Sequence, residues 1–347
     1  MTATPGVLMA AEIEQQPAML RRMLSDRAAD IAAVSREIGR RAPRFVLLAA
    51  RGTSDHAALY AKYLIEVLLG LPAGLVSPST MTVYGARPDL SQVLFLAVSQ
   101  SGGSPDLVES LSAARSCGAI TVAVTNNPGS ALADAAELAI DVAAGPERAI
   151  AATKSYTAEL MALYLLLAPM HGARLAPTAG LPDAAAATLA HGPVVQQMAA
   201  RFRFAERLVT TARGFSYPTA REAALKLMET SYLGAQAFSG ADLLHGPLAM
   251  IDDKVPIIAV LSPGRGGASM APALERLRDR RADLLLVGPD ADPAGAAVLP
   301  VQTTAIAEEL CPILEILPLQ QLALHLAIQR GSDPDEPRGL AKVTQTW

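Results

Sequence analysis

The stretch VLFLAVSQSGGSPD, residues 93–106, joins a fully apolar run to a loop rich in hydroxyl groups and glycines. A short apolar run of this kind is typical of a strand that is buried on both faces of a parallel sheet. The sequence PDLVESLSAARSCG continues with apolar residues at helical spacing and ends in a glycine. The stretch therefore predicts a strand, a polar loop and a helix that ends at Gly118.

The same order of elements recurs on both sides of this stretch. Strand-like apolar runs alternate with helical patterns, and this alternation predicts a parallel sheet with helices on both faces. The predicted strands are RFVLLAA (44–50), GLVSPST (74–80), AITVAVT (119–125) and ELAIDV (137–142). The predicted helices cover residues 11–42, SDHAALYAKYLIEVLLG (54–70) and TKSYTAELMALYLLL (153–167).

The second half of the chain repeats the first. ARGTS and ARGFS, VLFLAV and VPIIAV, and TVAVT and DLLLV are each separated by 162 residues. Such an internal repeat sets the architecture, so the predicted fold class is α/β with two copies of one unit. The predicted organisation is an N-terminal helical segment 1–29, a first domain 30–175, a second domain 190–330 and a tail 331–347.

Composition narrows the class of protein. The net charge of -4 argues against nucleic acid as a partner, because phosphate backbones need a basic face. Cys117 and Cys311 lie far apart, which favours a reducing cytosol over a secreted disulfide framework. The start lacks the pattern of a signal peptide, and no segment looks long and apolar enough to span a bilayer. We therefore expect a cytoplasmic protein with no membrane partner.

The hydroxyl loop predicts a phosphate site. In open parallel sheets, ligands bind at the carboxyl ends of strands, where loops meet helix N-termini. Gly102 and Gly103 allow close approach of an anion, and Pro105 suits the first turn of the next helix. ARGTSD (50–55) shows the same arrangement one strand earlier. The candidate ligands of a phosphate monoester are Gly52, Thr53, Ser54, Ser99, Gln100, Ser101 and Ser104.

An alternative is that these hydroxyl groups are ordinary helix N-caps. In the second copy the corresponding loop reads LSPGRG and has lost most of its hydroxyl groups. The fold therefore does not require them, which favours a ligand in the first copy.

The sequence resembles the sugar isomerase (SIS) family, whose domains bind phosphosugars, and in particular the isomerase half of glucosamine-6-phosphate synthases. The resemblance rests on ARGTS and SQSGGSPD and extends along nearly the whole chain. The other matching stretches are EIEQQP, TNNPGSALA, AATKS, REAALKLMETSY, LLHGPLAMID and PRGLAKVT.

The stretch REAALKLMETSY places Glu222, Lys226 and Glu229 on one helix face. By itself this pattern is more typical of a surface helix with an i,i+4 ion pair between Glu222 and Lys226. The resemblance implies that Glu229 moves a proton between C1 and C2 of the sugar, with Lys226 and Glu222 around it. A carboxylate that reaches both carbons can serve as such a base.

The resemblance assigns two further groups. It implies that His245 assists ring opening in the neighbouring subunit, and hence a homodimer. It also implies that Lys342 forms a Schiff base with an open-chain ketose, and that Ile150 and Ala341 contact the substrate. Taken alone, His245 would be a structural histidine and Lys342 a solvated tail residue.

No cysteine and histidine cluster has metal-ligand spacing, and no dinucleotide fingerprint follows a strand, so we expect no metal and no organic cofactor. The resembling synthases carry an N-terminal glutaminase with a cysteine after the initiator methionine, whereas this chain has Thr2 and matches from Glu12 onward. We therefore expect the reverse reaction: glucosamine 6-phosphate and water give fructose 6-phosphate and ammonia.

Other functions remain open. They are deamination of galactosamine 6-phosphate, cleavage of a fructosamine 6-phosphate, sensing of a phosphosugar without catalysis, and acceptance of ammonia from a separate glutaminase. Three positions depart from the family pattern: Arg51 replaces a frequent cysteine, Gly103 a glutamate and Ala152 a serine. These departures bear on which sugar is used more than on the chemistry, and Arg51 could favour a second acidic group on the substrate.

Overall fold

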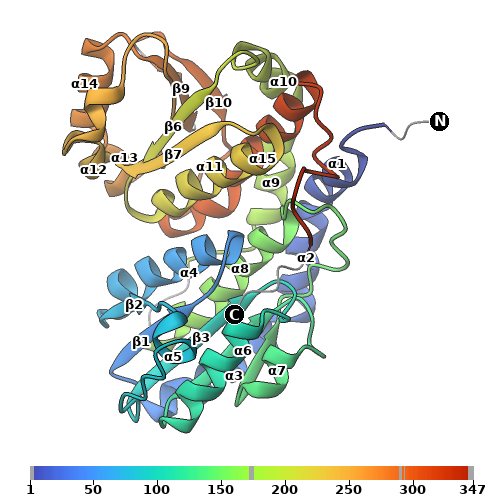
Figure 1. The fold of residues 1–347 in the computed structure, drawn as a ribbon, viewed down its shortest axis with the longest axis vertical. Helices are drawn as coiled ribbons and strands as arrows, with labels where there is room; N and C mark the ends of the chain where they lie inside the picture. The colour runs from blue at the N-terminus through green and yellow to red at the C-terminus, as the bar shows by residue number, and fades with distance from the viewer. Residues whose placement is uncertain (1–3, 172–175, 289–290, 293, 343–347) are drawn as a thin grey trace. The chain divides into compact units, whose positions relative to one another are not determined.

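The computed structural model describes the chain with short gaps, over residues 4–171, 176–288, 291–292 and 294–342. The described residues form two compact units, each built around one parallel sheet (Figure 1). The first-sheet unit takes in residues 18–147, the described part of 154–176, and 341–342. The second-sheet unit takes in the residues before 18, 148–153 and the described part of 177–340. The domain boundaries drawn from the sequence stay a prediction.

The first sheet has the strand order β2-β1-β3-β4-β5, and all its strands are parallel. Its strands are β1 (Phe45–Ala49), β2 (Ala73–Leu75), β3 (Val93–Ser99), β4 (Ile120–Thr125) and β5 (Leu138–Asp141). β3 is the central strand, and all its residues after Val93 are buried. Parallel pairing of β1 with β3, with Ala49 opposite Ala97, puts the carboxyl ends of both strands at one edge of the sheet.

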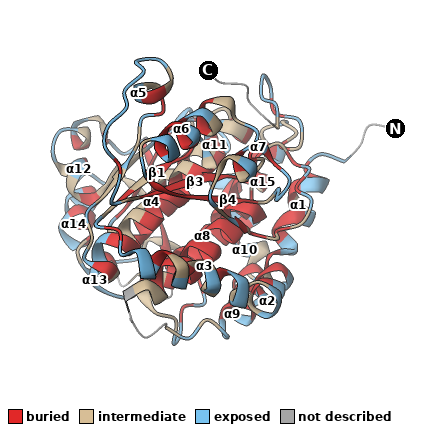
Figure 2. Cartoon of the chain, turned by 90° about the horizontal axis from the view of Figure 1, so that it is seen from below, coloured by how far each residue is buried: buried red, intermediate tan, exposed pale blue. Residues whose placement is uncertain are grey.

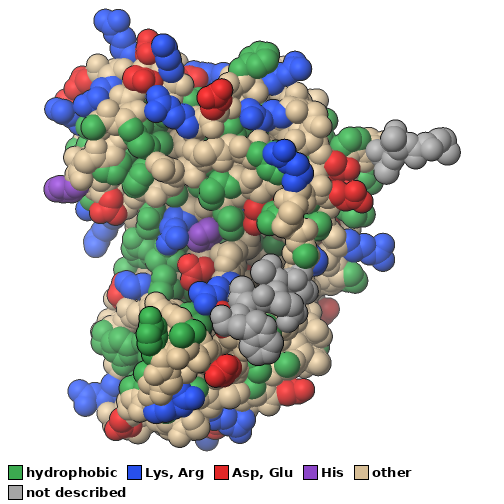
Figure 3. All heavy atoms as spheres, in the orientation of Figure 1, with side chains coloured by type: hydrophobic (Ala, Val, Ile, Leu, Met, Phe, Trp, Pro, Cys, Tyr) green, Lys and Arg blue, Asp and Glu red, His purple; other side chains and the backbone are tan. Residues whose placement is uncertain are grey.

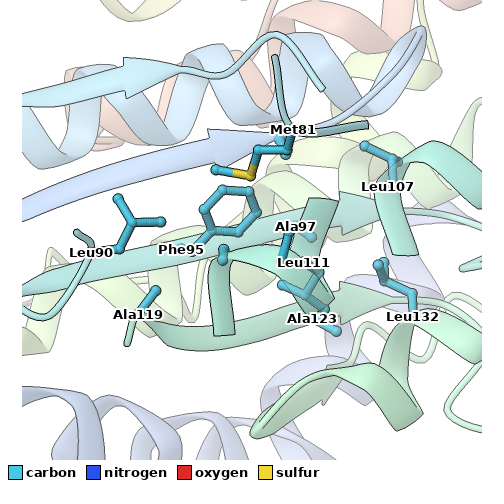
Figure 4. Packing of buried hydrophobic residues seen from close by; sticks show 12 residues of the cluster. Met81, Leu90, Phe95, Ala97, Leu107, Leu111, Ala119, Ala123 and Leu132 are labelled. Carbon is cyan, nitrogen blue, oxygen red and sulfur yellow. The ribbon is translucent and has the colours of Figure 1, made fainter. Parts of the chain in front are cut away.

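Helices cover both faces of the first sheet. Figure 4 shows Met81 beside the ring of Phe95 of β3, which is fully buried, and Leu107 and Leu132 farther along the same cluster. They come from helices on that face: α5 (Ser79–Thr82), α6 (Pro105–Ser116) and α7 (Ala131–Ala135). The helices α3 (Ala28–Arg41), α4 (Thr53–Leu64) and α8 (Lys154–Leu167) pack together away from this cluster. α8 is buried along its whole length (Figure 2).

The second sheet has the order β10-β9-β8-β6-β7 and is also parallel. Its strands are β6 (Arg207–Ala212), β7 (Gly234–Ser239), β8 (Pro256–Val260), β9 (Asp283–Gly288) and β10 (Ala297–Pro300). Read from β7, this order matches that of the first sheet. β6, β8 and β9 follow β1, β3 and β4 at close to the predicted spacing. The predicted fold class, two repeated α/β units, is confirmed.

The two faces of the second sheet carry different helices. Thr210 of β6 donates its hydroxyl to the carbonyl oxygen of Ala220 in α11 (Tyr217–Ser231), at 2.7 Å. Its neighbour Val209 packs instead with Leu243 of α12 (Gly240–Leu244) and Leu277 of α14 (Ala271–Asp279). Successive residues of a strand point to opposite faces, so α11 lies on one face and α12 and α14 lie on the other.

The remaining helices of eight residues or more are α1 (Val7–Glu14), α2 (Gln16–Asp26), α9 (Leu181–Leu189), α10 (Gly192–Arg201) and α15 (Cys311–Gln329). The prediction of one helix over residues 11–42 is wrong, because α1, α2 and α3 are separate. Pro17 explains the first break, since proline suits the first turn of a helix but cannot donate to a preceding turn. The predicted strand 74–80 shortens to β2, and Pro78 begins a helical turn instead.

One expectation about membrane spans needs correction. The 22-residue segment Glu308–Gln329 is long and apolar enough to cross a membrane by length and composition. Of its most apolar window, 89% is buried against the rest of the chain, as in the core helix of a folded unit. The segment passes the test because α15 lies in the core of the second-sheet unit.

The packing in Figure 4 predicts that Phe95→Ala lowers the free energy of unfolding by about 3–5 kcal/mol, because truncation leaves a cavity in a closely packed core. Chemical denaturation of parent and variant measures this loss. The matched control is Phe204→Ala, whose side chain is 87% exposed and should change stability by no more than about 0.5 kcal/mol. Equal effects of the two substitutions would contradict the assignment of Phe95 to the core.

Candidate active site

The loop after β3 is a tight turn closed by its own hydroxyl groups. The Oγ atom of Ser99 accepts a hydrogen bond from the Gly102 N–H at 3.2 Å, and that of Ser101 accepts one from the Gly103 N–H at 3.2 Å. Gly102 has a φ of 62°, and a Cβ atom there would lie 2.1 Å from the Oγ of Ser130. The turn therefore needs glycine at this position.

Ser104 is not an ordinary helix cap. It occupies the N-cap position of α6, but its side chain makes no capping hydrogen bond. Elsewhere Ser130 and Ser239 do accept such bonds at the starts of α7 and α12. The N-cap alternative therefore does not explain the Ser104 hydroxyl, which is partly exposed next to the first turn of α6.

The loop after β1 reaches the same edge of the first sheet. Gly52 is the N-cap of α4, with a φ of 54°, and Thr53 is partly exposed. Ser54 is buried and donates its hydroxyl to Oε1 of Glu159 in α8, at 2.9 Å. The two predicted phosphate loops are thus neighbours, although the Ser54 hydroxyl is directed at a carboxylate. Their binding of phosphate stays a prediction, as does the contact with Gln100, which is partly exposed.

The predicted acid–base residues form one group on α11. Lys226 is 1% exposed, and its Nζ lies 2.5 Å from Oε2 of Glu229 and 3.4 Å from Oε1 of Glu222. Glu222 is fully buried, whereas 21% of the Glu229 side chain is exposed. Burial lowers the pKa of Lys226, but the attraction of Glu222 and of Glu229 outweighs it and raises that pKa above its usual value. Lys226 is therefore a permanent cation that holds Glu229, the carboxylate with access to solvent.

This group differs from the surface ion pair that the segment alone could have formed. A buried lysine between two carboxylates pays a large desolvation cost, which only good pairing offsets. Such an arrangement is more typical of a functional site than of a solvated helix face.

His245 does not join this group within one chain. It is exposed at the C-cap of α12, and its N–H donates to the carbonyl oxygen of Asp242 at 3.0 Å. α12 and α11 cover opposite faces of the second sheet. Among the described residues, no hydrogen bond links His245 to Glu222, Lys226 or Glu229.

Lys342 has a buried partner that the sequence did not reveal. Its Nζ lies 3.1 Å from Oε2 of Glu147, whose side chain is fully buried. Ser155, in the first turn of α8, donates both its N–H and its hydroxyl to Glu147, at 3.0 and 2.6 Å. Lys342 is therefore held by a carboxylate that is itself fixed, unlike a solvated tail lysine. Glu147 lies 195 residues away, so no spacing pattern could have pointed to it.

The tail before Lys342 is anchored to the end of α11. The Arg338 N–H donates to the hydroxyl of Tyr232 at 2.9 Å, and the Arg338 guanidinium lies 3.8 Å from the centre of that ring. Tyr232 follows Glu229 by three residues and is the C-cap of α11. Arg338 of the closing motif and the end of the helix that carries Glu229 thus contact each other within the second-sheet unit.

The segment 148–153 carries Ile150 and Ala152, both partly exposed. Glu12 of α1 accepts hydrogen bonds from the N–H groups of Arg148 and Ala149. The side-chain amide of Gln320 donates to the carbonyl oxygen of Thr153 at 3.0 Å. The hydrogen bonds of Glu12 give EIEQQP a structural role. That Ile150 and Ala341, which is exposed, bind the substrate stays a prediction.

In the second repeat, the side-chain carboxylate of Glu308 lies in the loop that follows β8. Glu308 accepts hydrogen bonds from the N–H groups of Arg265 and Gly266, at 2.9 and 2.6 Å. A Cβ atom on Gly264, the counterpart of Gly102, would lie 2.2 Å from Glu308 Oε2. Nearby, Glu315 is buried within hydrogen-bonding distance of Ser216 and Thr219. This copy of the loop is closed by a side chain and differs chemically from the first.

The described residues contain no group of three or more histidine, cysteine, aspartate or glutamate side chains that could hold a metal ion. On the face in Figure 3, lysine and arginine side chains are interspersed with aspartate and glutamate rather than gathered in one patch.

Comparison with known proteins identifies the family. The SIS domain profile matches residues 41–169 and 201–330. The chain therefore belongs to the SIS domain family, as the sequence motifs predicted.

Three known proteins show how far the similarity extends. The chain is 36% identical to a glutamine–fructose-6-phosphate aminotransferase of Gloeobacter violaceus, over 96% of the chain but 58% of the relative, so it spans little more than half of that protein. A structure from Silicibacter pomeroyi DSS-3, provisionally named a phosphosugar isomerase, is 34% identical with a TM-score of 0.86, covering 94% of this chain and 99% of that one. The fold also matches glucosamine-6-phosphate deaminase of Thermotoga maritima, with a TM-score of 0.81 at 21% identity, covering 98% and 100%.

Glu315 predicts a pH dependence of stability. Burial raises its pKa to about 8, although hydrogen bonds from Ser216 and Thr219 act in the opposite direction. A carboxyl whose pKa is raised on folding stabilises the fold fully below its unfolded pKa of about 4.3. That stabilisation is lost as the pH rises through about 8.

We therefore expect Glu315→Gln, which cannot ionise, to become progressively more stable relative to the parent between about pH 5 and pH 8. The gain is at most about 1.4 kcal/mol per pH unit. Thermal and denaturant unfolding across this range measures the difference. Glu275→Gln, on the exposed side of α14, is the control and should follow the parent. A Glu315→Gln profile parallel to that of the parent would contradict the raised pKa.

Proposed function

We propose that this chain is a phosphosugar isomerase that deaminates an amino sugar 6-phosphate, with glucosamine 6-phosphate as its substrate. The observation that carries the proposal is the group on α11. The buried cation Lys226 holds Glu229, a partly exposed carboxylate, at 2.5 Å. Two hydroxyl-rich loops at one edge of the first sheet support binding of the 6-phosphate group of the substrate. Membership of the SIS family supports the same class of substrate.

The reaction follows from the chemistry of these groups. Ring opening exposes an aldehyde at C1 beside the amine-bearing C2. Glu229 removes the proton from C2 and returns it to C1, while O1 gains a proton and the nitrogen loses one, which converts the amino-aldose into a ketimine. Water then adds to the C2=N carbon, and ammonia leaves to give fructose 6-phosphate. Because one carboxylate serves both carbons, it must be held firmly while it changes protonation state, and Lys226 provides this hold.

Lys342 and Glu147 suit the hydrolytic step. Lys342 can attack the C2=N carbon and displace ammonia, and water then releases the ketose from the resulting Schiff base. A lysine amine must first lose a proton to act in this way. Glu147 lies at 3.1 Å and is the carboxylate placed to accept that proton. Ser155 fixes Glu147 through two hydrogen bonds.

The positions of Glu229 and His245 support action of His245 in a second copy of the chain. The helices that carry Glu229 and His245 lie on opposite faces of one sheet, so a single second-sheet unit does not bring them together. An exposed histidine at a helix end can instead serve the substrate of a partner subunit. We therefore propose a homodimer in which His245 acts across the interface.

A second candidate is the synthetic direction, with ammonia supplied by another protein. The matched relatives are glutamine–fructose-6-phosphate aminotransferases, and this chain corresponds to 58% of the length of the Gloeobacter violaceus protein. The same Glu229 would move the proton from C1 to C2. The test of this candidate is the rate at which the protein forms glucosamine 6-phosphate from fructose 6-phosphate and ammonium salts.

We expect the purified protein to release ammonia from glucosamine 6-phosphate, and Glu229→Gln to reduce the rate by about 100- to 10,000-fold, because the amide cannot accept the proton. A coupled ammonia assay measures both rates. Glu109→Gln, at an exposed position on α6, is the control and should retain the parental rate. If the parent binds glucosamine 6-phosphate in a thermal-shift assay yet releases no ammonia, the group at C2 of the true substrate differs.

The dimer proposal predicts complementation between two inactive variants. Glu229→Gln and His245→Asn should each be nearly inactive, whereas a heterodimer of the two contains one site with both residues intact. Random mixing should restore about a quarter of the parental activity if the interface has twofold symmetry. Absence of recovery in a mixture that forms heterodimers would place both residues in the same subunit.

A further inference from the structure

Arg51 belongs to the loop after β1, one of the two predicted phosphate loops of the first-sheet unit. It immediately precedes Gly52, the N-cap of α4. Its Nε and Nη2 atoms lie 2.8 and 2.7 Å from Oδ2 of Asp106. Asp106 is 2% exposed and belongs to the first turn of α6, two residues after Ser104. One ion pair thus ties the loop after β1 to the loop after β3.

Arg51 is the only cation within residues 50–55 and 99–106. The other polar groups of these two loops are hydroxyls, amides and backbone N–H groups, together with the carboxylates Asp55 and Asp106. A phosphate monoester carries a charge of about -1.5 to -2 at neutral pH. A guanidinium fork matches the geometry of an oxyanion and is weakly hydrated, so it suits this position.

Asp106 orients Arg51 without using up its donors. A guanidinium has five N–H donors, and the pair directs two nitrogens at one carboxylate oxygen. Nη1 has no hydrogen-bond partner among the described residues, and 48% of the side chain is exposed. The buried partner holds the guanidinium in one orientation, which lowers the entropy lost when it binds an anion.

We propose that the Arg51–Asp106 pair is an anion-binding element of the candidate site, in which Asp106 positions Arg51 and Arg51 binds an acidic group of the substrate. This inference rests on the proposed function, because it takes the substrate to be a sugar phosphate. The acidic group is either the phosphate itself or a carboxylate carried on the nitrogen at C2, as in a fructosamine 6-phosphate formed from an amino acid.

A purely structural role for Arg51 makes different predictions. In that case the pair would only join the two loops, and its loss would lower stability without selecting among ligands. The ligand affinity and the melting temperature of each Arg51 variant therefore both need to be measured. The effect of the charge of Arg51 also needs to be separated from the effect of its side-chain shape.

The experiment is isothermal titration calorimetry on the intact chain with three probes. They are inorganic phosphate, glucosamine 6-phosphate and the fructosamine 6-phosphate of glycine. Arg51→Ala removes the charge and the fork, whereas Arg51→Lys keeps the charge alone. Arg115→Ala, in the last turn of α6, is the matched control, since among the described residues this arginine donates to the carbonyl oxygens of Ala135 and Ala136 and to no acidic side chain.

We expect Arg51→Ala to weaken binding by about 10- to 100-fold, as for the loss of one charge-assisted hydrogen bond, with a smaller loss for Arg51→Lys and none for Arg115→Ala. Equal losses for all three probes identify the phosphate as the group bound. A loss confined to the glycine conjugate identifies the carboxylate.

Parental affinity of Arg51→Ala for all three probes overturns the inference, whatever its melting temperature. So does failure of the parent to bind any of them, which also removes the phosphosugar assignment. If Arg51→Ala weakens binding but the parent releases no ammonia from glucosamine 6-phosphate, the result contradicts the proposed deamination and not the role of Arg51.

Discussion

Parallel pairing of the strands is the constraint on which the candidate site depends. With Ala49 opposite Ala97, and Ser99 opposite Thr125, the ends of β1, β3 and β4 meet at one edge of the first sheet. β3 is buried on both faces, so its polar residues can appear only where the strand ends. The three hydroxyl groups of SQSGGS, those of Ser99, Ser101 and Ser104, therefore lie together in the turn after β3. That turn is closed by Ser99 and Ser101, which accept hydrogen bonds from Gly102 and Gly103.

The two repeats show how one fold supports two chemistries. In the first repeat the turn after β3 keeps a Ser104 hydroxyl that caps nothing. In the second repeat the corresponding turn receives the Glu308 carboxylate on its N–H groups. An internal carboxylate satisfies the same backbone donors that an anionic ligand would use. The second repeat carries α11, in which the buried Lys226 is paired with the buried Glu222 and with Glu229.

Local sequence patterns were sufficient to predict the architecture but not the ends of every helix. The repeat, the strands and the polar turn followed from apolar periodicity and glycine positions, which are properties of neighbouring residues. The helix predicted over residues 11–42 failed because periodicity does not register the interruption at Pro17. The expectation that no segment is long and apolar enough to span a bilayer failed at Glu308–Gln329, whose apolar residues form the core of a folded unit.

By itself, the sequence determined the fold class, the repeat, the hydroxyl turn and the shared helix face of Glu222, Lys226 and Glu229. Each of these depends on residues a few positions apart, where the spacing dictates the geometry. Only the tertiary structure decided that Lys226 is buried between its carboxylates and that Ser54 is directed at Glu159. It also decided that Glu147 holds Lys342 from 195 residues away, and that Asp106 holds Arg51. Burial and long-range pairing arise when separate segments pack together, so no local pattern encodes them.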